Sequence, residues 1–158
     1  MSLEEHDRVY ADDLAAGQTI QLGSRTLTQE EIIEFATAWD PHGFHVDESV
    51  AEAGFFGGII ASGIHSMAVY QRLAVDGALR HWAVIAGRTM TDVQMTKPVR
   101  AGMELSASMR IDRIEHRGPR RSLVHKTSFL THADDPVLTF NSSLYMHRRP
   151  TSAAEDYR

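Results

Sequence analysis

Apolar and polar residues alternate along the second half of the chain, most clearly between residues 103 and 112. The apolar positions are Met103, Leu105, Ala107, Met109 and Ile111, and every residue between them is polar. A period of two predicts a strand with one buried face. Similar runs, separated by turn signals such as Arg117-Gly118-Pro119, lie at 89–97, 121–131 and 136–147. Successive strands joined by short turns predict an antiparallel sheet.

The first half of the chain carries a helical period instead. Thr28 and Glu31 form the Thr-x-x-Glu pattern of a capping box, and one helical face then collects Ile32, Phe35, Ala36 and Trp39. We expect an amphipathic helix of about three turns here. It should end near Asp40-Pro41, because a residue that precedes proline is disfavoured in the α region.

A second helix is predicted from Ser62 onward, after a segment at 54–63 that holds four glycines and no charge. Apolar residues recur around most of the helical circumference between 64 and 75, which predicts a helix buried on most sides. Ser62 is the expected N-cap, and Gly63 then has an amide without an intrahelical acceptor. Helices early and strands late predict an α+β fold in which the sheet wraps around this long helix.

Length and composition predict a single globular domain of 158 residues, 42% hydrophobic and 23% charged. We expect it to span 10–149, between a flexible N-terminus at 1–9 and a flexible tail at 150–158. The absence of cysteine excludes disulfides, thiolate metal sites and a cysteine nucleophile. Apolar stretches fall short of the roughly 18 residues of a membrane span. The N-terminus lacks the features of a secretory signal, so we expect a cytoplasmic protein with no membrane partner.

The net charge of −5 is unevenly distributed. Of 21 acidic and 16 basic residues, 12 and 2 lie in 1–60, which leaves 9 and 14 in 61–158. An acidic chain is a poor general nucleic-acid binder, because phosphate contacts dominate such affinity. A local basic rim can still hold the phosphates of a small molecule, and its expected members are Arg117, Arg120, Arg121 and Lys126.

Candidate chemistry concentrates between Asp40 and Asp47, where two histidines and two carboxylates occur in eight residues. His42, His45 and Asp47 are residue types that ligate zinc or iron. A structural reading has Asp40 end its helix and leaves the histidines as solvated loop residues. In a third reading, Asp40 and His45 share a water molecule as an acid/base pair, because imidazole titrates near neutral pH. Spacing alone leaves these three readings open.

Three segments resemble one known family, the MaoC-like dehydratases, which include the (R)-specific enoyl-CoA hydratases. They are 35–48, with Asp40-Pro41-His42-Gly43-Phe44-His45 at its centre, 56–63 and 97–102. The family signature Asp-x-Asn-Pro-x-His places its Asp and His on Asp40 and His45. The chain departs from the family pattern where His42 replaces Asn, Gly43 replaces Pro, and Ser62-Gly63 replaces a frequent His-Gly pair.

The resemblance implies a hot-dog fold, a homodimer or higher homo-oligomer with the site at or near the subunit interface, and no cofactor. It implies the addition of water to the 2,3 double bond of an acyl-CoA or acyl-carrier thioester, or the reverse. His45 would take the water proton, while Asp40 would hold that water and exchange the C2 proton. The Gly63 amide, with Ser62 beside it, is the expected thioester-binding group at a helix N-terminus. Alternatively, Gly63 serves only close packing.

Two other functions remain open at this point. A hot-dog thioesterase would direct the water to the thioester carbonyl, although such enzymes more often act with a lone carboxylate. A non-catalytic acyl-thioester-binding subunit would keep the fold and lose the activity, and His42 and Gly43 favour this alternative. Fold alone does not decide between these functions.

Overall fold

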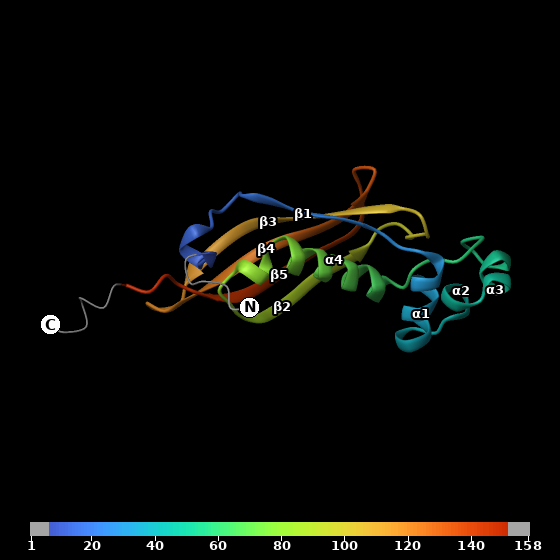
Figure 1. Ribbon diagram of the computed structural model, residues 1–158, viewed down its shortest axis with the longest axis horizontal. Coiled ribbons are helices and arrows are strands. Elements are labelled where there is room, and N and C mark those ends of the chain that lie inside the picture. Colours follow the sequence, from blue (N-terminus) through green and yellow to red (C-terminus); the bar gives the residue numbers. More distant parts are fainter. Residues whose placement is uncertain (1–6, 152–158) are drawn as a thin grey trace.

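Five antiparallel strands form one sheet that wraps around a long helix (Figure 1). In the computed structural model, which describes residues 7–151, the strand order is β1-β3-β4-β5-β2. The strands are β1 (Thr19–Thr26), β2 (Val84–Met95), β3 (Glu104–His116), β4 (Arg121–His132) and β5 (Asp135–His147). The long helix is α4 (Gly63–Gly77). This arrangement confirms the expected α+β hot-dog fold.

The alternating patterns locate β3, β4 and β5 well, whereas β1 was not predicted and β2 begins five residues before the expected position 89. β1 pairs with β3 at one edge of the sheet, and Leu22 is its single buried residue. A register shift between Gln21 and Gly23 interrupts it, with Gly23 at φ 99°. Because the strand buries so little and bends at a glycine, its sequence does not alternate.

The capping box at Thr28 forms as predicted. Thr28 Oγ1 accepts a hydrogen bond from the Glu31 amide, and the Glu31 carboxylate accepts one from the Thr28 amide. The helix that follows, α1, spans Gln29–Trp39 and ends at Asp40, which confirms the prediction. Two short helices that were not predicted, α2 (Gly43–Val46) and α3 (Glu48–Ala53), fold the next segment against α1.

Helix α4 begins at Ser62, whose side chain accepts a hydrogen bond from the Ile64 amide as the expected N-cap. The helix buries Val69, Tyr70 and Leu73 against the sheet, with the Tyr70 ring edge-on to Phe140 of β5 at 4.9 Å. Ile64 is 52% exposed, so α4 presents a face to solvent and is less enclosed than its apolar content suggested.

Figure 1 places α1, α2 and α3 together at one end of the sheet, and the β3–β4 turn at the opposite end. The short 3-10 helices η2 (Ala11–Asp13) and η3 (Leu79–His81) lie near that opposite end. There, Arg148 and Arg149 pair with Asp12 and Asp13.

The predicted N-terminal segment 1–9 and tail 150–158 lie largely outside the described residues. Val9, at the start of the described chain, already exchanges backbone hydrogen bonds with His81 and Ala83. Within residues 7–151, no helix is long and apolar enough to cross a membrane.

Candidate active site

Asp40 is held at the point where α1 ends. Its amide closes the last turn onto the Ala36 carbonyl, and its φ of −156° turns the chain away from the helix before Pro41. Asp40 Oδ2 accepts a hydrogen bond of 2.6 Å from the hydroxyl of Ser62, and the side chain is 26% exposed. A partly exposed carboxylate that is fixed by one strong donor keeps its remaining lone pairs available to water or substrate.

His45 lies in α2, buried to 5% exposure, with its ring edge-on to Phe44 at 4.4 Å. Its Nδ1 is 2.6 Å from the backbone carbonyl of Ile60. A carbonyl only accepts, so Nδ1 carries the proton and Nε2 is left as the reactive nitrogen. Nε2 faces Asp40 Oδ2 at 3.5 Å. This distance leaves no room for a water molecule between the two atoms, but a water molecule to one side of the pair can hydrogen-bond to both.

Ser62 and Gly63 form the N-terminus of α4 next to this pair. The Ser62 hydroxyl is fully buried, donates to Asp40 and accepts from the Ile64 amide. It is therefore committed to protein groups, which corrects the expectation that Ser62 contacts the thioester. The Gly63 amide pairs with no acceptor in the described part of the chain. A free amide at a helix N-terminus attracts developing negative charge.

A cavity of about 410 Å³, here called the His45 cavity, opens beside these groups. His45, Gly63 and Ser66 line one side, and the end of β2 with the following residues lines the other. A Cβ on Gly63 would collide with the side chain of Met95. The absence of a side chain at Gly63 therefore allows close packing against Met95, and Gly63 also lines the cavity. Close packing and a role for the amide in binding the thioester are compatible at this position.

The three candidate metal ligands do not come together. The Asp47 carboxylate caps α3, where it accepts hydrogen bonds from the Val50 amide and the Ser49 hydroxyl. The His42 side chain is 70% exposed, with Nε2 3.7 Å from Asp40 Oδ1. No group of three histidine, aspartate or glutamate side chains in residues 7–151 is arranged to hold a metal ion.

His65, on α4, is buried and stacks on Phe35 at 4.3 Å. Its Nδ1 has no hydrogen-bond partner within residues 7–151. Burial lowers the pKa of His65, so the ring stays neutral at physiological pH. It lines a different hollow, beside Arg25 and Phe35, and takes no part in the Asp40–His45 arrangement.

The expected basic rim divides into two parts. Arg117, Arg120 and Arg121 are exposed and lie at the β3–β4 turn, at the end of the subunit away from Asp40 and His45 (Figure 1). Their expected role, binding the phosphates of coenzyme A, stays a prediction. Lys126 is only 5% exposed and points toward α4, which corrects its assignment to a rim. The signal was present in the sequence, because Lys126 has the same strand parity as Val124 and Leu130, which face the core.

Two groups of the site have no signal in the residue pattern. The Ile60 carbonyl sets the His45 tautomer, and a main-chain atom leaves no trace in the sequence. Met95, at the end of β2, closes the cavity over Gly63. Its role depends on how β2 is placed relative to α4, which periodicity does not specify.

Comparisons with known proteins identify the family of the chain and confirm its fold. Residues 13–132 match the family model described as MaoC like domain. The Bacillus subtilis protein YdeM, itself uncharacterised, is 36% identical over 94 residues that cover 60% of this chain and 67% of that protein. The crystal structure of the MaoC-like dehydratase from Rhodospirillum rubrum has a TM-score of 0.82 at 28% identity, covering 90% of this chain and 99% of the other. An unliganded R-hydratase from Pseudomonas aeruginosa has a TM-score of 0.69 at 19% identity, with coverages of 90% and 88%.

Proposed function

The chain belongs to the MaoC-like dehydratase family, and we propose that it adds water to the 2,3 double bond of an enoyl-CoA, or removes water from the 3-hydroxyacyl-CoA. The observation that carries the proposal is the approach of Asp40 Oδ2 to His45 Nε2 at 3.5 Å beside a cavity, with the other ring nitrogen engaged by the Ile60 carbonyl. Two polar groups that lie side by side can both hydrogen-bond to one water molecule, which suits a reaction whose second substrate is water.

In the hydration direction, His45 Nε2 takes a proton from the water molecule that Asp40 holds. The water oxygen forms a bond to C3, the electron pair of the 2,3 double bond moves to C2, and negative charge spreads to the thioester oxygen. The acid/base pair then returns one proton to C2, which leaves hydroxyl on C3 and restores both side chains. The Ile60 carbonyl stabilises the imidazolium that forms, because it accepts from Nδ1 in either protonation state.

The Gly63 amide is the proposed donor to the thioester oxygen. It lies at the N-terminus of the fifteen-residue helix α4 and lines the same cavity as His45. One such donor typically contributes about 3 kcal/mol to stabilising the transition state. Ser62 is a positioning residue, since its hydroxyl orients Asp40 and caps α4 without facing the substrate.

The proposed assembly is a homodimer formed along β2. This strand lies at the edge of the sheet, and all twelve of its residues are exposed in the single chain. Several are large and apolar, namely Val84, Ile85, Met90, Val93 and Met95. A long apolar edge with unpaired backbone groups is a template for a second strand. Pairing with β2 of a second copy would cover it by a two-fold arrangement.

The decisive experiment follows loss of enoyl absorbance and release of free thiol in parallel, with 2-enoyl-CoA substrates of several lengths. Asp40→Asn and His45→Ala should each reduce kcat/KM for hydration by about 10²–10⁴-fold, the usual contribution of a general acid or base. The double variant should be scarcely worse than either single one, because one missing member already disables the pair. Circular dichroism verifies that each variant is folded.

His42→Ala is the matched control. It removes an exposed imidazole three residues from His45, so it should retain most of the activity. Release of thiol without loss of enoyl absorbance would identify a thioesterase instead. Full activity of Asp40→Asn and His45→Ala would refute the acid/base pair, and binding without turnover in the unmodified protein would leave the binding-subunit alternative.

A further inference from the structure

Lys126 is an unusual member of the protein core. It lies on β4, on the face of the sheet that packs against α4, with 5% of its surface exposed. Its amine lies 5.6 Å from the centre of the Tyr70 ring and 5.8 Å from that of Phe140, and it donates a 3.3 Å hydrogen bond to Ser128 Oγ. No carboxylate pairs with it among residues 7–151. Lysine is almost never buried without such a partner.

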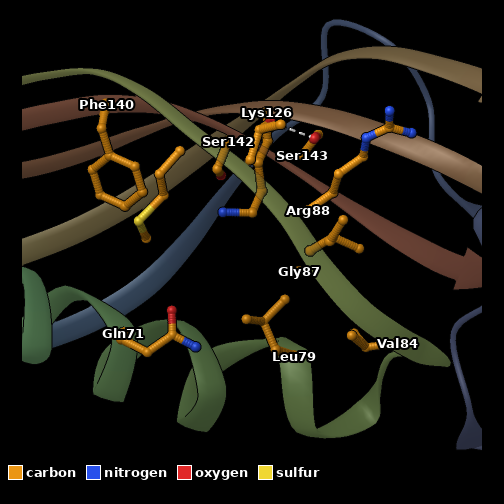
Figure 2. Close-up of a pocket in the computed structure, with 12 residues that line it drawn as sticks. Gln71, Leu79, Val84, Gly87, Arg88, Lys126, Phe140, Ser142 and Ser143 are labelled. Carbon is orange, nitrogen blue, oxygen red and sulfur yellow. Dashed lines mark hydrogen bonds between the residues drawn. The ribbon is translucent and has the colours of Figure 1, made fainter.

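The amine borders a second cavity, of about 360 Å³, here called the Lys126 cavity. Figure 2 shows the Lys126 side chain directed into the space between β2 and α4, with Gln71 on the opposite wall. Ser142 lies directly across the β4–β5 ladder from Lys126, and its buried hydroxyl has no hydrogen-bond partner within the described residues. The rest of the lining is mostly apolar, as in ligand-binding pockets.

The two cavities share no lining residue, but their lining residues follow one another along the same three elements, α4, β5 and β2. On α4, Ser66 lines the His45 cavity and Gln71 lines the Lys126 cavity. On β5, the corresponding residues are Val137 and Phe140, and on β2 they are Met95 and Met90. Strands β2 and β5 are paired over this stretch, and Tyr70 of α4 contacts Phe140 of β5, so a chain whose thioester lies at Gly63 can extend between α4 and these strands toward Lys126.

We propose that the Lys126 cavity binds a carboxylate at the far end of the acyl chain, so that the preferred substrate is the thioester of a dicarboxylic 2-enoic acid. This inference rests on the proposed function for the position of the thioester. Lys126 and Ser142 offer an ammonium and a free hydroxyl to the two carboxylate oxygens. A methyl end would leave the Lys126 charge buried without a counter-charge and the Ser142 hydroxyl without a hydrogen-bond partner, which is costly.

The distance between Gly63 and the Lys126 cavity determines the length of this substrate. Gly63 and Tyr70, whose ring lies under the Lys126 amine, are seven helical residues apart, or about 10 Å along the axis. With a carbon–carbon bond of about 1.5 Å, an extended chain advances about 1.25 Å per bond, so about eight bonds cover this distance. An acyl chain of about eight carbons therefore places its carboxylate beside Lys126.

The test compares trans-2-octenedioyl-CoA with trans-2-octenoyl-CoA, which differ only in the terminal carboxylate. The unmodified protein should hydrate the dicarboxylic thioester with a kcat/KM about 10- to 100-fold higher, the range expected for hydrogen bonds to a charged group. Lys126→Met should remove this preference and leave hydration of octenoyl-CoA unchanged or faster. Ser142→Ala should lose a smaller part of the same preference.

Equilibrium binding of the saturated octanedioyl-CoA and octanoyl-CoA separates this inference from the proposed function. A preference for the dicarboxylic ligand that disappears in Lys126→Met supports the subsite even if no hydration is detected. Equal binding and equal turnover of the two thioesters overturn it while leaving the hydratase proposal intact. If Lys126→Met converted a dimer to monomers, the inference would also be overturned. Lys126 would then pair with an acidic group of a second copy of the chain and not with a substrate carboxylate.

Discussion

Replacement of Lys126 by methionine should stabilise the folded protein near neutral pH, by an amount that falls as the pH rises. Burial lowers the pKa of Lys126 to about 8, from the ordinary 10.5. Below pH 8 the amine is charged in both the folded and unfolded chains, so the folded state bears the full desolvation cost. Above pH 10.5 it is neutral in both, and the cost is absent.

The size of this effect follows from the shift. A difference of about 2.5 between the two pKa values, at 1.36 kcal/mol for each unit, corresponds to about 3 kcal/mol in the free energy of unfolding. Between pH 8 and 10.5 the unfolded chain holds more protons than the folded one, so stability should rise with pH in this window. Methionine fills a similar volume without charge and should remove the whole dependence.

Urea unfolding of both proteins at matched concentration, at several pH values from 7 to 10.5, measures this difference. Lys126→Met should be more stable by about 3 kcal/mol at pH 7 and equal to the unmodified protein near pH 10.5. A difference that does not change with pH would refute the assignment of the penalty to the amine. A less stable variant at pH 7 would mean that an acidic group compensates Lys126 in the assembled protein.

Two further changes test the site and the assembly. Gly63→Ala should lower kcat/KM by at least about tenfold, because the added Cβ enters the His45 cavity beside the amide donor. If the second change Met95→Ala restored activity, the loss would come from the collision with Met95 alone. Ile85→Lys should prevent pairing along β2, so sedimentation should find monomers of this variant and the proposed dimer of the unmodified protein. A dimer that persists in the variant would place the interface elsewhere.

Sequence patterns located the elements whose periodicity comes from burial. The alternation in β3 was readable because Leu105, Ala107 and Met109 all face the core. In β2, by contrast, every residue is exposed in the single chain, and register shifts break the pattern at three places. Alternation therefore marked only part of this strand, since its hydrophobic residues have no covering partner in the subunit.

The sequence predicted which residues form the candidate site, but it did not predict the contacts that orient them. Spacing brought Asp40 and His45 to one loop, and the resemblance selected them as a pair. The contacts that orient them come from Ile60 and Ser62, which are distant along the chain by 15 and 22 residues. Such contacts depend on how the Gly-rich segment crosses α2, which is a property of the fold and not of local sequence.

Two of the departures from the family pattern, Gly43 and Ser62, fit their surroundings. At position 43 a Cβ would lie 2.7 Å from Cγ1 of Val50 on α3, so a proline would collide with this valine. Glycine leaves room for the valine side chain. At position 62 one hydroxyl oxygen both donates to Asp40 and accepts from the Ile64 amide. A histidine would need its two separate ring nitrogens for these two bonds. Ser62 thus keeps Asp40 oriented and α4 capped without the histidine frequent in the family, and this favours the proposed hydration over the alternative of a binding subunit.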